Sequence, residues 1–456
     1  GGLELALACT HRVASDSGKT TLQFPEVMLG ILPAWGGTTR LPRLIGLTAS
    51  LDMLLQGRRA DARKAQRIGL ITEVFPTDLF ESKVGEFAAR VAEATLEVDQ
   101  RRRKLLTRVV DGAGPLRRVV LAVARRRVLK STGGHYPAPL RIIDILVKHL
   151  GGAIEHSLAA EARAAAELVV SSVCKNLVHV YYMREAARKG TGVATTAVKP
   201  KDVRVLGVLG AGVMGGGIAH LAARNRVRVY MKDIRHDAVT GGLRHARARF
   251  DRAVQRRRLS PREADQSMEL IGGGLDYHGL AAADLVVEAV VERMDVKRQV
   301  LAETEGHVGP ECILATNTSS LSVNGMADAL ERPERFCGLH FFNPVERMPL
   351  VEVIRGGATS DWTVASVYSF ALLLGKVPVV VGDRPGFLVN RILAPYLNEA
   401  GFLLGDGATI ERVDRVAKEF GMRMGPLRLI DEVGIDVSRH AGESLHEALG
   451  PRLAPS

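Results

Sequence analysis

The sequence predicts an α/β fold in which a mostly parallel sheet occupies residues 200–381 and helices occupy much of the rest. Short apolar runs alternate with helical patterns across that region, and a glycine-rich turn directly follows the first run. The pattern becomes helical again from residue 382 to the end. Strands are expected near residues 203–209, 227–231, 285–290, 312–316, 336–341, 350–354 and 377–381.

The turn after the first expected strand has the glycine pattern of a dinucleotide site. Residues 210–215 read GAGVMG, with a strand before them and a helix after them, and this context makes a common pattern specific. Gly210 would make the tight turn, Gly212 would let the backbone approach a pyrophosphate, and Gly215 would let helix and strand pack closely. Val213 and Met214 of this turn are also expected to bind the cofactor. A helix is expected at residues 218–223, and the free N–H groups at a helix N-terminus favour phosphate.

The residue after the second expected strand indicates which dinucleotide binds. Asp233 can accept hydrogen bonds from a ribose 2′-OH and would repel the 2′-phosphate of NADP. Lys232 and Arg235 flank it and weaken that preference. We therefore expect NAD as the cofactor.

Composition narrows the class of protein. A chain of 456 residues with 46% hydrophobic residues predicts two to four domains with sizeable cores. No apolar run approaches the roughly 20 residues of a membrane span. The four cysteines lie far apart and form no CxxC pair, which fits a reducing compartment, and we expect no metal site.

Much of the net charge of +12 lies in arginine-rich runs. These are residues 101–104, 117–118 and 125–127, which we interpret as solvated helix faces. A nucleic-acid-binding surface is the alternative, and it is disfavoured because no aromatic residues interleave the charges. Basic surface would also suit an anionic substrate.

Four segments are expected along the chain, at residues 1–78, 79–199, 200–381 and 382–456. The first mixes short strands and helices, with Asp61 as a helix N-cap, Gly69 ending that helix and a strand at 70–75. The second is helical and ends in a linker. Its clearest helices are expected at residues 154–170 and 173–188.

Residues suited to alcohol oxidation follow the later strands. Ligands of an open α/β sheet bind beyond the carboxyl ends of the strands, and Asn317 and His340 each lie at such an end. Oxidising an alcohol with NAD needs a base, and histidine titrates near neutral pH. A carboxylate such as Glu352 would fix the tautomer of that base. Taken singly, His340 also fits a structural role and Glu352 also fits a surface charge. Asn317, Ser319 and Asn390 could each cap a helix.

Five motifs, in order, give this part of the chain a resemblance to a known family. From about residue 201 to the end, the sequence resembles the L-3-hydroxyacyl-CoA dehydrogenases, in which a Rossmann-type NAD-binding domain precedes an all-α domain. The matching motifs are GAGVMG, VVEAVVE (286–292), NTSSL (317–321), GLHFFNPV (338–345) and PGFLVNR (385–391).

The resemblance implies a role for each matching residue. His340 would be the general base and Glu352 its carboxylate partner, while Ser319 and Asn390 would bind and position the 3-hydroxyacyl group. Asn343 would also bind substrate. Three further residues would line the nicotinamide–ribose end of the cofactor: Glu292, Lys297 (also near the CoA) and Asn317.

The first 76 residues carry a second set of motifs. Glu4 lies in GGLE and Glu26 in PEVMLG, which is followed by LPAWGGTTRLP. Taken alone, both fit ordinary solvent-facing acids, but paired carboxylates also suit the addition of water across an activated double bond. The motifs resemble the second half of the crotonase fold of the enoyl-CoA hydratases. This resemblance implies that Glu4 and Glu26 are catalytic and that Gly1 supplies an oxyanion-hole N–H.

The ends of the sequence predict a fragment. No initiator methionine precedes Gly1, and Ser456 follows soon after a motif. We expect a crotonase-like domain without its N-terminal half and a truncated helical C-terminal domain. Residues 1–456 alone are therefore expected to have little or no hydratase activity.

The order hydratase, helical linker, dehydrogenase resembles the multifunctional fatty-acid oxidation enzymes of bacteria and mitochondria. It implies hydration of a trans-2-enoyl-CoA, followed by NAD-dependent oxidation of the L-3-hydroxyacyl-CoA to the 3-ketoacyl-CoA. It also implies a thiolase subunit as partner, and a cytoplasmic location in a bacterium or a mitochondrial one in a eukaryote. No nucleic-acid partner and no transmembrane segment are expected.

Three other interpretations remain open. The chain could be an NAD-dependent dehydrogenase of the same fold that acts on another hydroxyacid. It could be a non-enzymatic module that binds acyl-CoA or RNA, or an inactive truncation product.

Overall fold

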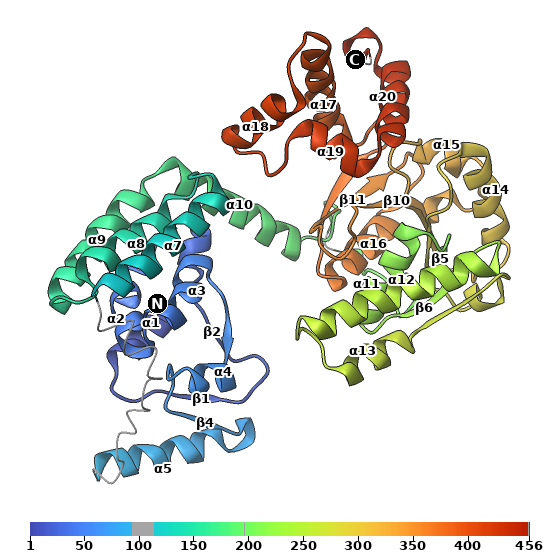
Figure 1. Cartoon of the computed structure of the whole chain (residues 1–456). Helices are drawn as coiled ribbons and strands as arrows, with labels where there is room; N and C mark the ends of the chain where they lie inside the picture. Colours follow the sequence, from blue (N-terminus) through green and yellow to red (C-terminus); the bar gives the residue numbers. More distant parts are fainter. Residues whose placement is uncertain (94–113, 196, 455) are drawn as a thin grey trace. The chain divides into compact units, whose positions relative to one another are not determined.

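The computed structural model describes residues 1–93, 114–195, 197–454 and 456, and it divides the chain into two compact units (Figure 1). Unit 1 comprises Gly1–Met183 and Lys418–Arg423, and unit 2 comprises Arg184–Ala417 and Met424–Ser456. The basic run expected at 101–104 lies outside the described residues. Within the described part of the chain, no helix is long and apolar enough to cross a membrane.

Unit 2 is built on an eight-stranded sheet in the order β12-β11-β10-β9-β8-β5-β6-β7. Strands β5 to β10 are parallel, β11 runs antiparallel to β10, and β12 is parallel to β11. The order reverses between β5 and β8, and such a switch point is where doubly wound sheets bind nucleotides. The strands are β5 (Val205–Leu209), β6 (Arg228–Lys232), β7 (Ile271–Gly274), β8 (Leu285–Glu288), β9 (Ile313–Thr316), β10 (Phe336–Phe341), β11 (Leu350–Arg355) and β12 (Val377–Gly382).

All seven strands expected from the sequence are confirmed within two residues, and one strand was not predicted. Strand β7 reads IGGG, and three successive glycines give almost no strand signal. It forms because Ile271 to Gly274 pair in register with Val229 to Lys232 of β6. Tertiary pairing therefore supplies what local propensity does not.

Two hydrophobic cores lie against the two faces of the sheet. The larger one contains apolar residues of β5, β6, β10 and β11 together with four helices: α11 (Val213–Arg224), α12 (His236–Gln255), α13 (Pro261–Met268) and α16 (Asp361–Leu373). The other one contains residues of α14 (Met294–Glu305) and α15 (Val323–Ala327). Helices thus cover both faces, as expected for a mostly parallel sheet (Figure 1).

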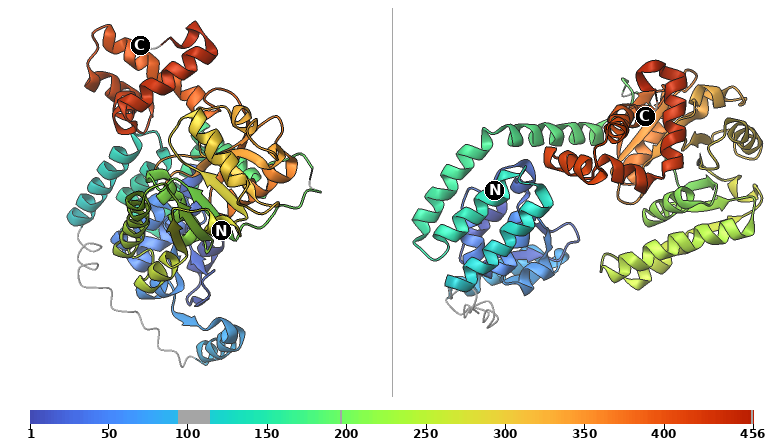
Figure 2. Two further views of the ribbon diagram at one scale, coloured as in Figure 1. Left: turned by 90° about the vertical axis from the view of Figure 1, so that its right-hand side faces the viewer. Right: turned by 45° about the horizontal axis from the view of Figure 1, so that its top comes forward.

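The chain after β12 is helical, as the sequence predicts. In both views of Figure 2 these helices, coloured orange-red to red, form one cluster. Within it, α17 packs against α19 and α20. The elements are α17 (Val389–Gly405), α18 (Ile410–Phe420), α19 (Pro426–Val433), α20 (Ile435–Leu449) and the short η5 (Pro451–Leu453).

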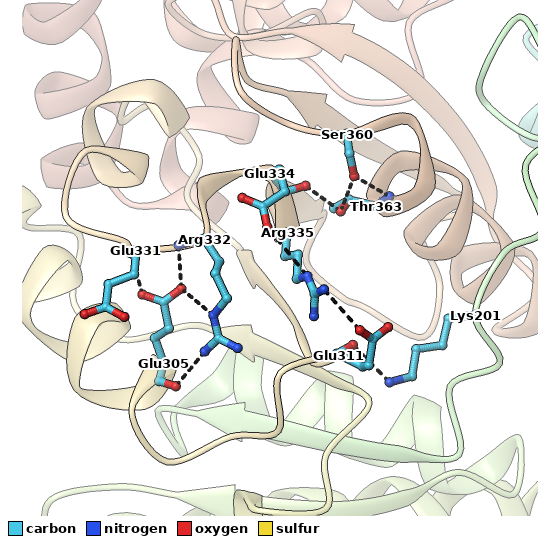
Figure 3. A network of polar contacts seen from close by, with 9 residues as sticks. All are labelled: Lys201, Glu305, Glu311, Glu331, Arg332, Glu334, Arg335, Ser360 and Thr363. Atoms are coloured by element: carbon cyan, nitrogen blue, oxygen red, sulfur yellow. Dashed lines mark hydrogen bonds and ion pairs between the residues drawn. The ribbon is translucent and has the colours of Figure 1, made fainter.

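A polar network fixes the segment that leads into β10 (Figure 3). Glu305 at the end of α14 accepts hydrogen bonds from the backbone N–H groups of Glu331 (2.7 Å) and Arg332 (2.9 Å). Arg335 donates to Glu311 (3.1 Å), and Thr363 of α16 donates to the Glu334 carbonyl (2.7 Å). The network thus holds the start of the strand whose other end carries His340.

Unit 1 consists of short strands and many helices. Strands β1 and β4 pair in parallel, and β2 and β3 pair antiparallel. Its elements are α1 (Gly2–Ala8), β1 (Val13–Ser15), β2 (Thr21–Leu22), η1 (Pro25–Leu29), α2 (Gly37–Ile45), α3 (Leu47–Gln56), β3 (Ala60–Asp61), α4 (Ala62–Arg67), β4 (Glu73–Phe75), η2 (Thr77–Leu79), α5 (Phe80–Ala92), α7 (Gly114–Thr132), α8 (Pro137–His149), α9 (Ile154–Val169) and α10 (Ser172–Lys189), the last of which continues into unit 2.

Local signals in unit 1 are confirmed with one correction. Asp61 caps α4, because its carboxylate accepts a hydrogen bond from the Lys64 N–H at 2.7 Å. The strand expected at 70–75 is shorter, and only Glu73–Phe75 is a strand. Leu70 and Ile71 are buried in the core instead, without strand pairing. Burial, not pairing, therefore explains their apolar character.

The apolar core of unit 1 is shared between its first 75 residues and the later helices. Leu41 and Leu54 from the first part, and Leu121 of α7 and Ile142 of α8, are all fully buried in one continuous cluster. Leu168 of α9 belongs to the same cluster. The helices that follow residue 113 are therefore part of this core.

One buried histidine gives unit 2 a pH-dependent stability. His220 of α11 is 3% exposed, its ring lies 4.5 Å from that of Phe250, and its Nδ1 has no hydrogen-bond partner among the described residues. Burial lowers the pKa of His220 to about 4, against an opposing effect of Glu346. The unfolded chain takes up this proton near pH 6.5, so stability is full above that pH and is lost as the pH falls toward 4.

We therefore expect His220→Phe to protect unit 2 against acid. Between pH 7 and pH 5 this one group should cost the natural chain about 2 kcal/mol of unfolding free energy, and the variant should be spared that loss. Urea unfolding of both proteins at the two pH values measures the difference. Equal losses in both would contradict the assignment.

Candidate active site

His340 and Glu352 form a buried pair at the end of β10. The antiparallel register places them directly opposite each other on β10 and β11. His340 Nδ1 and Glu352 Oε2 lie 2.7 Å apart, and the residues are 5% and 0% exposed. The other oxygen of Glu352 accepts hydrogen bonds from the N–H groups of Leu388 (3.0 Å) and Val389 (2.9 Å), where α17 begins. One carboxylate thus joins two strands to the helical part of unit 2.

These donors settle the charge of Glu352. Burial alone raises the pKa of its carboxyl, but the hydrogen bond from His340 and those from Val389 and Leu388 outweigh it and lower the pKa. Glu352 is therefore an anion that holds His340 through Nδ1. That leaves Nε2 as the ring nitrogen able to take a proton from another molecule.

The loop after β9 is fastened to this pair. The side-chain oxygen of Asn317 accepts a hydrogen bond from the Phe341 N–H (2.9 Å), the residue next to His340. Asn390 Nδ2 in the first turn of α17 donates to the Ser319 carbonyl (3.0 Å). The structure therefore brings Asn317, Ser319 and Asn390 together near the His340–Glu352 pair.

Glu292 and Lys297 hold the same loop from the side of β8. Glu292 accepts hydrogen bonds from the N–H (2.8 Å) and the hydroxyl (3.2 Å) of Ser319. Lys297, 1% exposed, pairs with Glu292 (3.2 Å) and with the fully buried Glu288 (2.7 Å). Burial raises the pKa of Glu292, but the charge of Lys297 and the hydrogen bond from Thr318 outweigh it, so the net pKa is lowered.

Asn317, Ser319 and Asn390 do not cap helices, and Glu352 is not a surface charge, so these alternatives are wrong. Ser322, not Asn317 or Ser319, caps α15 by accepting a hydrogen bond from the Gly325 N–H. Helix α17 has no side-chain cap from Asn390, and Glu352 is fully buried rather than a surface charge.

The glycine-rich turn has the expected geometry. Gly210 has φ +92°, and a Cβ there would lie 2.5 Å from the Ala289 carbonyl oxygen. A Cβ on Gly215 would lie 1.9 Å from the Gly210 carbonyl oxygen, so helix α11 packs this closely only with glycine. A Cβ on Gly212 would meet nothing within 4 Å, which leaves the helix N-terminus open to a ligand.

Asp233 lies beside this turn. Its carboxylate accepts hydrogen bonds from the Ala211 N–H (2.8 Å) and the Ile234 N–H (2.7 Å). The Lys232 ammonium sits over the Tyr277 ring at 4.2 Å, and Arg235 pairs with Asp237 at 3.2 Å. Both flanking cations therefore have partners of their own. Of the other two predicted residues, Val213 is exposed and Met214 is half-buried against the core.

One predicted residue lies apart, and three contributors were not predicted. Asn343 is exposed beyond the end of β10 and takes no part in the hydrogen bonds described above. Glu288, Thr318 and Phe387 were missed, although Glu288 and Thr318 lie in the VVEAVVE and NTSSL motifs. Phe387, 4% exposed, lies with its ring centre 5.9 Å from that of His340. Among the described residues, no group of histidine, cysteine or acidic side chains could hold a metal ion.

Glu4, Glu26 and Gly1 also come together, in unit 1. The Gly1 nitrogen lies 3.7 Å from Glu4 Oε2 and 3.5 Å from Glu26 Oε1. Glu4 is 3% exposed, so it is not a solvent-facing acid. Its other oxygen accepts hydrogen bonds from the N–H groups of Trp35 (2.8 Å) and Gly37 (2.9 Å). Glu26 Oε2 is buried without a hydrogen-bond partner among the described residues.

Comparisons with known proteins agree with this geometry. Residues 205–384 match the family model of the 3-hydroxyacyl-CoA dehydrogenase NAD-binding domain, and residues 386–456 match that of its C-terminal domain. Residues 1–117 match the enoyl-CoA hydratase/isomerase model. The NAD-binding domain inferred from the glycine pattern is therefore confirmed.

Individual relatives cover the chain to different extents. The fatty acid oxidation complex subunit alpha of Shewanella baltica is 41% identical over 99% of this chain, which spans 64% of the length of that relative. The structure of (S)-3-hydroxybutyryl-CoA dehydrogenase PaaH1 from Ralstonia eutropha shares 40% identity and a TM-score of 0.54, and covers 56% of this chain and 91% of its own. The 3-hydroxybutyryl-CoA dehydrogenase from Escherichia coli K12 shares 38% identity, with a TM-score of 0.55, and covers 56% of this chain and 55% of its own. The chain thus belongs to the 3-hydroxyacyl-CoA dehydrogenase family through residues 205–456. Its first 117 residues match the enoyl-CoA hydratases and isomerases.

Proposed function

We propose that unit 2 oxidises the L-3-hydroxyl group of a fatty acyl-CoA to the ketone with NAD, in fatty-acid β-oxidation. The observation that carries the proposal is the buried His340–Glu352 hydrogen bond of 2.7 Å at the carboxyl end of β10. It provides a base with a fixed tautomer on a sheet whose glycine-rich turn suits a dinucleotide.

The residues of unit 2 fit NAD. The open N-terminus of α11 would bind the pyrophosphate. Asp233, which lies beside that turn, would accept hydrogen bonds from the ribose hydroxyls. Bound NAD supplies the hydride acceptor of the reaction. Lys297 and Glu292 lie beside Ser319 and would line the nicotinamide–ribose end.

Proton removal falls to His340. Its Nε2 takes the hydroxyl proton, and the ring becomes an imidazolium that the Glu352 anion stabilises. The Ser319 hydroxyl and the Asn390 amide hold the substrate oxygen near that nitrogen. The two residues lie side by side, since Asn390 Nδ2 donates a hydrogen bond to the Ser319 carbonyl. Asn343 binds substrate from its exposed position after β10.

We propose further that unit 1 serves the hydration of trans-2-enoyl-CoA, with Glu4 and Glu26 as the acid–base pair and an oxyanion-hole N–H from Gly1. The segments 1–78, 79–199, 200–381 and 382–456 would then be a crotonase-like part, a helical linker, the NAD-binding domain and the C-terminal dehydrogenase domain. A thiolase subunit would consume the ketoacyl product. Because the three similar proteins named above are bacterial, we propose a cytoplasmic location.

Removing the base tests the dehydrogenase mechanism. We expect His340→Gln to lower kcat for L-3-hydroxybutyryl-CoA oxidation by about 10²- to 10⁴-fold, because Gln cannot take the hydroxyl proton. NADH formation measures the rate, and fluorescence titration measures NAD binding, which should be unchanged. His307→Gln, at an exposed histidine of the same unit, is the matched control.

Full activity of the His340 variant with normal NAD binding would refute the role of this residue. Faster oxidation of a free hydroxyacid than of the acyl-CoA by the natural protein would favour a different substrate class.

Asp233 should set the preference for NAD over NADP. Asp233→Asn keeps an oxygen for the Ala211 N–H but removes the charge that repels a 2′-phosphate. We expect the ratio of kcat/KM for NAD to that for NADP to fall about tenfold, equivalent to about 1.4 kcal/mol. Asp202→Asn, at an exposed aspartate of the same unit that faces Arg204, is the control. An unchanged ratio in the Asp233 variant would show that this carboxylate does not select the cofactor.

A further inference from the structure

In unit 1, the turn that leads into α2 is held by carboxylates from two separate helices. Glu4 of α1 accepts hydrogen bonds from the Trp35 and Gly37 N–H groups. These groups lie at the start of α2, where N–H groups have no acceptor within the helix. The position of the Glu4 carboxylate therefore depends on where residues 35–37 are placed.

The second carboxylate is Glu161 of α9, and it holds two further N–H groups of the same turn. It accepts hydrogen bonds from the Gly36 N–H (2.5 Å), the Thr39 N–H (2.9 Å) and the Thr39 hydroxyl (2.6 Å). The Ser157 hydroxyl, one turn earlier on α9, lies 3.0 Å from the same Thr39 hydroxyl. The N–H groups of neighbouring residues in this turn are thus shared between Glu4 and Glu161.

Burial makes this arrangement specific. Glu161 is 0% exposed, on the face of α9 that also buries Ser157, Ala164 and Leu168. A carboxylate removed from water is costly unless donors meet it, so its three donors must stay in place. Burial raises the pKa of Glu161 to about 7 against the effect of those hydrogen bonds, and the charge of Glu4 adds to the rise.

Because planar peptide units join successive residues, Gly36 and Thr39 cannot shift without turning the N–H groups of Trp35 and Gly37. Gly36 has φ +100°, and a Cβ there would overlap the Arg40 guanidinium, so the turn is tightly packed. Glu161 thereby controls the donors that orient Glu4.

We propose that Glu161 is a positioning residue of the hydratase site, which aims the Glu4 carboxylate by fixing the turn at residues 35–39. The proposal rests on the hydration function proposed above for Glu4 and Glu26. Glu161 lies beyond residues 1–117, the stretch that matches the hydratase family model.

The test uses the complete protein, including whatever precedes residue 1. Glu161→Gln keeps the shape of the side chain but places an NH₂ group against N–H donors. We expect kcat for hydration of crotonyl-CoA to fall about 10- to 100-fold with KM changed less than about twofold, because a misplaced catalytic group slows chemistry more than binding. The dehydrogenase rate of the same sample should be unchanged. Glu155→Gln, an exposed position on the same helix, is the matched control and should keep full hydratase activity.

A second variant keeps the proposal testable if Glu161→Gln does not fold. Thr39→Val removes the hydroxyl that donates to Glu161 and contacts Ser157, but it keeps the Thr39 N–H. We therefore expect a smaller fall in kcat than for Glu161→Gln, with unchanged KM. A hydratase kcat within about twofold of the natural protein in both variants would overturn the positioning role. A natural protein without any hydratase activity would instead overturn the proposed hydration function, and the positioning role with it.

Discussion

Buried carboxylates that accept backbone N–H groups are the interaction on which both units depend. An acid removed from water must find donors, and an irregular loop has N–H groups that no helix or sheet satisfies. Glu352 accepts hydrogen bonds from N–H groups at the start of α17, Glu305 from those before β10, and Glu161 from those at the start of α2. Each pairing meets both needs and ties a loop to an element far away in the sequence.

The loops held in this way are the ones that carry the two candidate sites. The sheet of unit 2 places the backbone of His340. The hydrogen bond from Glu352 orients the His340 ring, and the other oxygen of Glu352 is held by the N–H of Val389 at the start of α17. Ser319 is likewise placed by Glu292, which Lys297 and the buried Glu288 support from α14 and β8. The rigid sheet and the fixed loops together bring side chains from separate motifs into one place.

Sequence reasoning found the features with local signals and missed those that depend on distant partners. The strands of unit 2 were predicted because apolar runs and turns are local, whereas β7, with three glycines, exists only through its pairing with β6. His340 and Asn390 were found because they lie in the motifs GLHFFNPV and PGFLVNR. Glu161 was missed: its stripe of buried positions is visible in the α9 sequence, but its partner Thr39 lies 122 residues away.

The two sites use buried carboxylates that meet different partners. Glu352 faces an imidazole as well as two N–H groups, and its pKa is lowered, so it is an anion ready to stabilise a protonated His340. Glu161 accepts hydrogen bonds from the Gly36 and Thr39 N–H groups and the Thr39 hydroxyl, and burial raises its pKa to about 7. Glu352 shares in the chemistry because it contacts the base itself, whereas Glu161 contacts only the turn that orients Glu4. This difference in partners distinguishes a carboxylate that shares in the chemistry from one that positions.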